Sequence, residues 1–138
     1  MSDERTRSGT ARLTAAREAG DADAIARLLA EDVVLETPAS LGIAAVRGRD
    51  AVATVLGGAV AKTYLQAETI VREVLRTIVD GDLSVVKSRL SGRTVEEADY
   101  DNEYVCIYVW RDGLVARVEE HPDTLRIVQS GIAKLAKT

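Results

Sequence analysis

The side chains with the clearest chemical potential lie on strands predicted in the second half of the chain. Glu120 shares one face of a predicted strand with Ala116 and Val118. A carboxylate among apolar neighbours can act as a general acid or base near neutral pH. The alternative is a glutamate in water at a rim, or in a salt bridge with Arg89, because purely structural ion pairs also hold such acids.

Tyr104 and Asn102 share one face of the preceding predicted strand. A tyrosine hydroxyl in a pocket could donate a hydrogen bond to a carbonyl or a developing oxyanion, although it could also be a core tyrosine. Arg89 lies on a face with Lys87 and Ser91, which by itself is typical of a solvated strand surface.

The remaining reactive residue types give weaker signals. His121, the single histidine, alternates to the opposite face from Glu120, which favours a structural role at a strand end. Cys106 lies between two aliphatic residues, which indicates a small buried hydrophobe without a disulfide. No His, Cys and carboxylate cluster has metal-ligand spacing, and no glycine-rich phosphate loop follows a strand. We therefore expect neither a metal ion nor a cofactor.

Composition narrows the class of protein. The 138 residues fit one domain spanning 1–138, and 46% hydrophobic residues can build a full core. A net charge of −4 argues against a nucleic-acid binder, and the early arginines (Arg5, Arg7, Arg12, Arg17) alternate with acids as on a solvated helix surface. Without an apolar run of membrane length, a signal core or a second cysteine, we expect a cytoplasmic protein that does not enter a membrane.

Helices are predicted in the first half of the chain. The first runs from about Ser8 to Ala19 and stops at Gly20, and the second begins at Asp21 or Asp23. The second helix should place Ile25, Leu28 and Leu29 on one face, end at residues 31–32 and precede a short strand over 33–35. A third helix, capped by Asp50, should continue through Gly57 and Gly58 to Val60.

Long strands are predicted after about Gln66. They cover residues 70–79, 83–93, 100–111 and 114–121, with turns at Asp80–Asp82 and Asp112–Gly113. A terminal helix should follow, capped by Asp123 or Thr124. Its predicted apolar stripe contains Leu125, Val128, Ile132 and Leu135. Segregated helices and antiparallel strands indicate the α+β class.

The strand over 102–110 is apolar on both faces. Val105, Ile107 and Val109 lie on one face, and four aromatic or sulfur-containing residues lie on the other. A one-sided antiparallel sheet would show a polar outer face. We therefore expect helices and a pocket on one side and a subunit contact on the other, which predicts a homodimer.

Three segments carry a family resemblance: AGDADAIARLLAEDVVLETP (19–38), GRDAV (48–52) and YDNEYVCIYVWRDGLVARVEEHPDT (100–124). They resemble the nuclear transport factor two-like superfamily, especially its SnoaL-like branch of polyketide cyclases, limonene epoxide hydrolases and ketosteroid isomerases. The resemblance covers nearly the whole chain. It implies a cone-shaped, curved antiparallel sheet (a cystatin-like α+β barrel) wrapped around N-terminal helices, with a C-terminal helix and an apolar pocket.

The resemblance also suggests roles for single residues. In the epoxide hydrolase pattern, the arginine corresponds to Arg89 and the acid of the last strand to Glu120. The resemblance turns the Arg89 face inward, where the guanidinium would pair with Glu120 or hold an anionic substrate group. The water-activating carboxylate of that pattern falls on Ser91, and its Tyr and Asn fall on Leu35 and Thr37.

The ketosteroid isomerase pattern matches no better. Its base falls on Thr37 beside Glu36, and strand alternation points these two side chains in opposite directions. Its acidic oxyanion donor falls near Cys106. A cyclase-like reaction needs one acid–base carboxylate, which Glu120 could supply.

These observations favour a cofactor-independent enzyme that uses general acid–base chemistry on a terpenoid-, polyketide- or epoxide-like molecule. Glu120, Arg89 and Tyr104 would be catalytic, and the pocket would also use Asn102, Ser91, Thr37, Leu35 and Val118. Two alternatives stay open. One is a non-catalytic binding protein for a small hydrophobic ligand, and the other is a dimeric interaction module.

Overall fold

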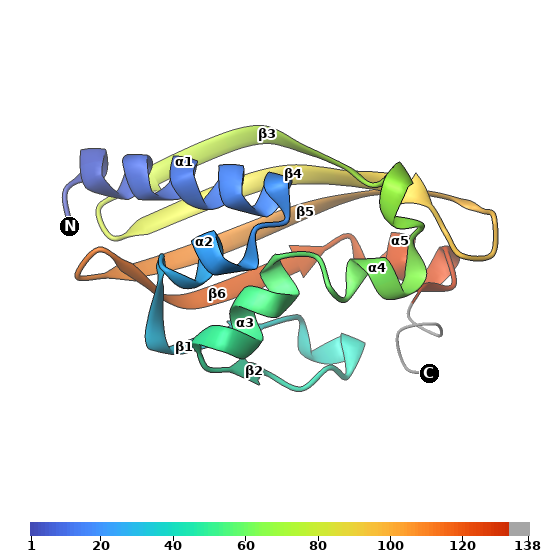
Figure 1. The fold of residues 1–138 in the computed structure, drawn as a ribbon, viewed down its shortest axis with the longest axis horizontal. Coiled ribbons are helices and arrows are strands. Elements are labelled where there is room, and N and C mark those ends of the chain that lie inside the picture. The colour runs from blue at the N-terminus through green and yellow to red at the C-terminus, as the bar shows by residue number, and fades with distance from the viewer. Residues whose placement is uncertain (133–138) are drawn as a thin grey trace.

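A long, curved sheet dominates the structure, a computed structural model that describes residues 1–132 (Figure 1). In chain order the elements are α1 (Asp3–Ala19), α2 (Ala22–Ala26), β1 (Leu29–Glu36), η1 (Ala39–Leu41), β2 (Val46–Arg47), α3 (Arg49–Leu56), α4 (Ala61–Tyr64), η2 (Ala67–Thr69), β3 (Val71–Asp80), β4 (Leu83–Arg93), β5 (Asp99–Arg111), β6 (Leu114–Pro122) and α5 (Thr124–Gln129).

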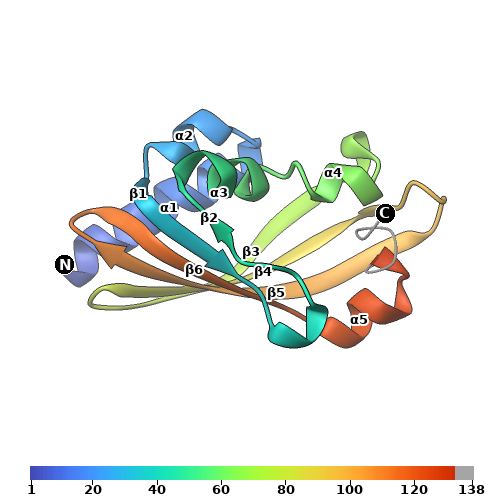
Figure 2. The same ribbon diagram turned by 90° about the horizontal axis from the view of Figure 1, so that it is seen from below.

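The six strands form one sheet in the order β2-β1-β6-β5-β4-β3. All neighbours are antiparallel except β1 and β6, which run parallel. Figure 2 shows the sheet curving beneath α1, α2 and α3, which cover one face. The predicted α+β architecture is confirmed: an open, curved sheet wraps around N-terminal helices and is followed by a C-terminal helix.

α1 is attached to the sheet by a small buried polar network. Its start is capped by Ser2, whose hydroxyl accepts from the Arg5 N–H. Within the core, the Thr10 hydroxyl donates to Ser84 Oγ at 2.8 Å, and Trp110 Nε1 donates to the same oxygen at 3.0 Å. These bonds satisfy buried polar atoms and set the position of α1 over β4 and β5.

The second predicted helix is shorter than expected. α2 ends at Ala26, and Leu29 is already part of β1, so the predicted helical face of Ile25, Leu28 and Leu29 is wrong. All three side chains are nevertheless buried in the main core. Ile25 lies in α2, Leu28 in the turn that follows and Leu29 in β1. Because all three are buried, their spacing in the sequence is the same as that of one apolar helix face.

The third predicted helix is interrupted at its glycines. α3 ends at Leu56, and α4 is a separate helical turn that begins at Ala61. Gly58 adopts a φ of +97°, which breaks the helix and which side chains other than glycine rarely accept. Gly48 is the cap of α3, so the prediction that Asp50 caps it is also wrong.

The long strands agree with their predicted ranges, but the stripe of the last helix does not. Asp123 caps α5 by accepting from the Leu125 and Arg126 N–H groups. Leu125 and Val128 are 63% and 66% exposed, whereas Ile127 and Ile132 are buried. α5 is so short that its contact face is set by Ile127, and the predicted Leu135 lies outside the described residues.

Within residues 1–132, no helix has both the length and the apolar character that crossing a membrane requires.

The close approach of α1 to Trp110 makes a stability test. A Cβ added at Gly9 would lie 2.7 Å from the Trp110 ring. We expect Gly9→Val to lower the free energy of unfolding by about 2 kcal/mol, because the rigid ring cannot move away. Urea unfolding measures the change. Ser8→Ala, on the exposed side of α1, is the control, and its free energy of unfolding should stay within about 0.5 kcal/mol of wild type. An unchanged Gly9→Val midpoint would contradict this packing.

Candidate active site

A cavity of about 320 Å³ lies between β1, α3, α4, β5, β6 and α5. Its walls are mostly aliphatic, and four lining residues carry polar side-chain groups: Thr37, Tyr64, Tyr104 and Glu120. The lining residues are Leu35, Thr37, Leu41, Ile43, Ala44, Val46, Val55, Val60, Tyr64, Tyr104, Glu120, Pro122, Ile127 and Ile132. An apolar hollow with a few polar groups is the usual form of a small-molecule site.

Glu120 is held by Arg17, which reaches across from α1. Arg17 Nη2 lies 3.4 Å from Glu120 Oε1, and the two side chains are only 11% and 18% exposed. Arg17 Nη1 also donates to the Tyr108 hydroxyl at 2.8 Å, and its Nε donates to the Leu56 carbonyl at 3.4 Å. The guanidinium thus stabilises a carboxylate anion at the cavity wall and fixes its orientation.

The electrostatics of this pair follow from burial. Desolvation alone would lower the pKa of Arg17, but Tyr108, Cys106 and Glu120 around it raise that pKa above its ordinary value. Arg17 is therefore a permanent cation.

Cys106 completes the surroundings of Glu120. Its Sγ lies 3.7 Å from Glu120 Oε1, and burial followed by the Glu120 charge raises the pKa of the thiol to about 11. The thiol is therefore protonated at neutral pH and donates to the carboxylate. The predicted burial of Cys106 is confirmed, but its contact with the candidate acid–base group was not foreseen.

Three tyrosines and an asparagine form a second polar group. The Tyr104 and Tyr100 hydroxyls are 2.6 Å apart, and Asn102 Nδ2 donates to Tyr100 Oη at 2.9 Å. Desolvation raises the pKa of Tyr64 to about 12 and also raises the pKa values of Tyr100 and Tyr104. All three hydroxyls stay neutral, so Tyr104 can offer a proton to a ligand in the cavity.

Thr37 contributes a hydroxyl that the described part of the chain leaves unsatisfied. Its Oγ1 is buried, yet it has no hydrogen-bond partner among residues 1–132. Leaving such a group unpaired is unfavourable, so a ligand oxygen in the cavity is a suitable partner. Leu35 lines the same wall, while Glu36 points away and binds Arg117 at 2.6 Å.

Four predicted site residues do not line this cavity. Arg89 was predicted to face inward towards Glu120, and this is wrong. Its side chain is exposed and forms an ion pair with Asp101, with Nε 2.6 Å from Oδ1. Ser84, Val86 and Leu90 are buried on β4, so alternation places Arg89 and Ser91 on the outer face.

Asn102 and Val118 are both buried behind the cavity wall. Asn102 Nδ2 donates hydrogen bonds to the Tyr100 hydroxyl and to the Asp123 carbonyl, so it would hold Tyr100 in place without contacting a ligand itself. Val118 belongs to the main core and is fully buried. Of the predicted residues, the structure brings together Glu120, Tyr104, Thr37 and Leu35.

Arg17 was missed because its helix looked uniformly polar. It follows Leu13 by four residues and Thr10 by seven, and both of those are fully buried. That spacing places Arg17 on the inner face of α1, which was the available signal. Tyr64 gave no comparable signal, because its helix has only four residues.

Within the described residues 1–132, no group of three or more His, Cys, Asp or Glu side chains could hold a metal ion. The residues around the cavity instead combine one carboxylate, one fixed guanidinium and neutral hydroxyl donors. Such a set can move a proton and stabilise a negative charge on oxygen.

The fold is that of a SnoaL-like protein. The SnoaL-like domain family matches residues 10–118, which is most of the chain, and the protein belongs to that family. No curated protein matches the sequence.

Solved structures support the same fold. A Kribbella flavida protein whose name proposes ketosteroid isomerase activity has 24% identity and a TM-score of 0.68, over 87% of this chain and 78% of its own. A Jannaschia sp. CCS1 protein named for a proposed SnoaL-like polyketide cyclase has 18% identity and a TM-score of 0.75, over 92% and 91%. Bal32a, from a soil-derived mobile gene cassette, has 20% identity and a TM-score of 0.75, over 89% and 92%.

The buried thiol predicts how stability depends on alkaline pH. Above pH 9 the unfolded chain loses the Cys106 proton, whereas the folded chain keeps it until about pH 11. The unfolded state then binds fewer protons, so the free energy of unfolding should fall by up to about 1.4 kcal/mol per pH unit in this window. Urea unfolding between pH 9 and 10 measures the slope.

Cys106→Ala should make that slope shallower by the share of the thiol, whatever its effect on absolute stability. The buried tyrosines add a slope of their own as they ionise in the unfolded chain towards pH 10, and the variant keeps that part. Equal slopes for the variant and the wild type would contradict the assignment.

Proposed function

We propose that the protein is a cofactor-independent enzyme that moves a proton on a small, mostly apolar carbonyl compound, as an isomerase or cyclase does. The observation that carries the proposal is Glu120, a carboxylate on the wall of an apolar cavity and 3.4 Å from the buried Arg17. In that setting Glu120 is the general base, Arg17 is a positioning residue, and the hydroxyls of Tyr104 and Thr37 face the same space.

The proposed step balances within the cavity. Glu120 removes a proton from the carbon beside a carbonyl, and the electrons of the C–H bond form a C=C bond while negative charge moves to the oxygen. Tyr104 or Thr37 donates a hydrogen bond to that oxygen. Return of the proton to another carbon gives an isomer. In the cyclase case the carbanion attacks a second carbonyl and closes a ring, and the resulting alkoxide takes the proton back from Glu120.

The residue set favours this chemistry over epoxide hydrolysis. Hydrolysis of that type needs a second carboxylate to activate water, and Glu120 is the one carboxylate that lines the cavity within residues 1–132. In addition, Glu120 forms an ion pair with Arg17 Nη2 at 3.4 Å, an arrangement that suits a base better than an acid that protonates an epoxide oxygen.

A non-catalytic binding protein is the second candidate. The unsatisfied Thr37 hydroxyl and the aliphatic walls would suit a small hydrophobic ligand without any reaction. In both cases we infer a cytoplasmic location from the lone cysteine, which a reducing compartment would keep as a thiol.

Proton exchange provides the test without knowledge of the natural substrate. A panel of cyclic ketones and enones in D₂O should show enzyme-dependent deuterium uptake at the carbon beside the carbonyl, followed by NMR. We expect Glu120→Gln to lower the rate at least about 100-fold, because the amide cannot accept the proton.

Glu119→Gln is the matched control, since Glu119 points outward and binds Arg117 at 3.1 Å. Full exchange by Glu120→Gln would refute the assignment of the base. Binding of panel members without exchange by the wild type, with each compound recovered unchanged by mass spectrometry, would favour the binding-only alternative.

We also propose that the outer face of the sheet joins two copies of the chain. Ile78 on β3, Val85 on β4 and Ile107 on β5 are register partners in one row of that face. Leu83 and Val109 are partners in the row beside it. Ile78 is 51% exposed in the single chain, and contiguous aliphatic side chains of this kind are typical of subunit contacts.

Sedimentation velocity tests the proposed dimer. We expect the wild type to sediment as a dimer at micromolar concentration and Ile78→Asp to shift it towards a monomer, because a carboxylate would be buried unpaired. Val95→Asp is the control, as Val95 is similarly exposed but lies in the β4–β5 turn. A wild-type monomer at all concentrations would rule the dimer out.

A further inference from the structure

A second, smaller cleft lies beside the catalytic cavity and is lined by basic side chains. Its volume is about 170 Å³, and it lies where the end of α1, the Gly57–Gly58 turn and the start of β3 meet. Arg17, Lys62 and Arg72 line it, with Glu18 as the one acidic lining residue; the others are alanines, glycines and Ile70. Three cations against one carboxylate give the cleft a net positive charge.

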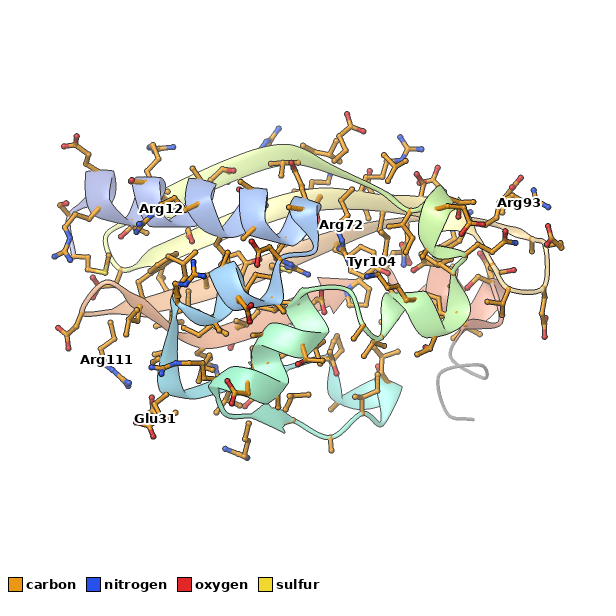
Figure 3. The ribbon with its side chains drawn as sticks, in the orientation of Figure 1. Arg12, Glu31, Arg72, Arg93, Tyr104 and Arg111 are labelled. Atoms are coloured by element: carbon orange, nitrogen blue, oxygen red, sulfur yellow. The ribbon has the colours of Figure 1, made fainter. Side chains whose placement is uncertain are left out.

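Arg72 differs from Lys62, which is exposed to solvent, in being partly withdrawn from water. It is half-buried, and within residues 1–132 it has neither a carboxylate within 4 Å nor a hydrogen-bond partner. Figure 3 shows the labelled Arg72 near the end of α1, whereas Arg93 and Arg111 lie towards the periphery. Both of these peripheral arginines have carboxylate partners.

Arg17 adds a second positive charge next to Arg72. Both guanidinium groups line the same cleft. Burial first, and then the charge of Arg17, lower the pKa of Arg72, and the charge of Glu120 partly offsets them. Glu120 is the carboxylate that pairs with Arg17. The buried Arg17 and the half-buried Arg72 therefore have this one carboxylate between them. A second anion would relieve the repulsion.

The geometry of the cleft suits a small oxyanion. A Cβ placed on Gly58 would lie 3.9 Å from Arg72 Nη2, which is ordinary van der Waals contact, so the turn borders the guanidinium. Planar guanidinium groups bind carboxylate and phosphate oxygens in pairs, and Lys62 adds an ammonium at the exposed edge.

We propose that this cleft is a binding site for a carboxylate or phosphate group, held by Arg72, Arg17 and Lys62. Arg17 contacts Glu120 on one side and lines the cleft on the other, so an oxyanion competes with Glu120 for the same guanidinium. The proposed site does not require catalysis, and it stands even if the cavity only binds its ligand. The oxyanion is either a separate small anion or the charged end of the molecule that occupies the cavity.

Calorimetric titration with inorganic phosphate tests the site. Ionic strength is held constant with sodium chloride, so that non-specific screening does not change. We expect saturable binding, which Arg72→Gln weakens about tenfold or more because charged hydrogen bonds are lost. Arg76→Gln is the matched control, with the same charge change on an exposed position of β3, and it should change the affinity less than about twofold.

Two further measurements separate binding from folding and from catalysis. Arg72→Gln should not lower the melting temperature of the free protein, because it removes an unpaired cation beside Arg17. Glu120→Gln, which lacks the proposed base, should still bind phosphate and should bind it about two- to tenfold more tightly, since Arg17 is released. Absence of saturable phosphate binding, or equal weakening by Arg72→Gln and Arg76→Gln, would overturn the proposal.

A matched pair of probes identifies the source of the anion. Cyclohexylacetate and cyclohexylacetamide share an apolar ring and differ in charge. If the anionic group belongs to the cavity ligand, cyclohexylacetate will bind more tightly than both acetate and the amide. Ile43→Trp, which narrows the cavity, will then weaken the binding of cyclohexylacetate. If the anion is separate, Ile43→Trp will leave acetate and cyclohexylacetate binding unchanged.

Discussion

The burial of one guanidinium group organises this molecule. Arg17 extends from the last turn of α1 and contacts the Leu56 carbonyl of α3, the Tyr108 hydroxyl of β5 and the Glu120 carboxylate of β6. A buried cation is tolerated only where such partners surround it. The same contacts therefore join the helical layer to the sheet and place a carboxylate at the cavity wall, so that structure and proposed chemistry depend on one side chain.

The hollow next to this pair follows from the composition of the core. The chain has no Phe and only one Trp, and Trp110 packs at the far end against Gly9 of α1. Around the cavity the sheet curves away beneath short helices, and the walls consist largely of Val, Leu, Ile and Ala. Small aliphatic residues on a strongly curved sheet leave space that larger aromatic residues would fill.

The predictions succeeded where a pattern is local and regular. The strand ranges and the α+β class followed from alternation and turn residues, and the inward direction of Tyr104 and Glu120 agrees with the family resemblance. They failed where position depends on distant partners. Arg89 faces solvent, as its own strand pattern indicates and against the inward position that the resemblance implied, and the helix predicted through Gly57 and Gly58 is broken there. Arg17 was taken for a surface residue although its spacing from Leu13 places it inward.

What the sequence alone determined is therefore the class of fold and the order of elements, which depend on periodicity and on turn chemistry over a few neighbouring residues. The prediction of Glu120 as the acid–base residue came from its apolar strand face and from the family resemblance. The tertiary structure decided which cation faces Glu120, which hydroxyls share its cavity and which half-buried arginine lines the basic cleft. Those relations join residues up to about a hundred positions apart, such as Arg17 and Glu120. They depend on how the sheet curves, and the spacing of neighbouring residues in the sequence does not predict that curvature.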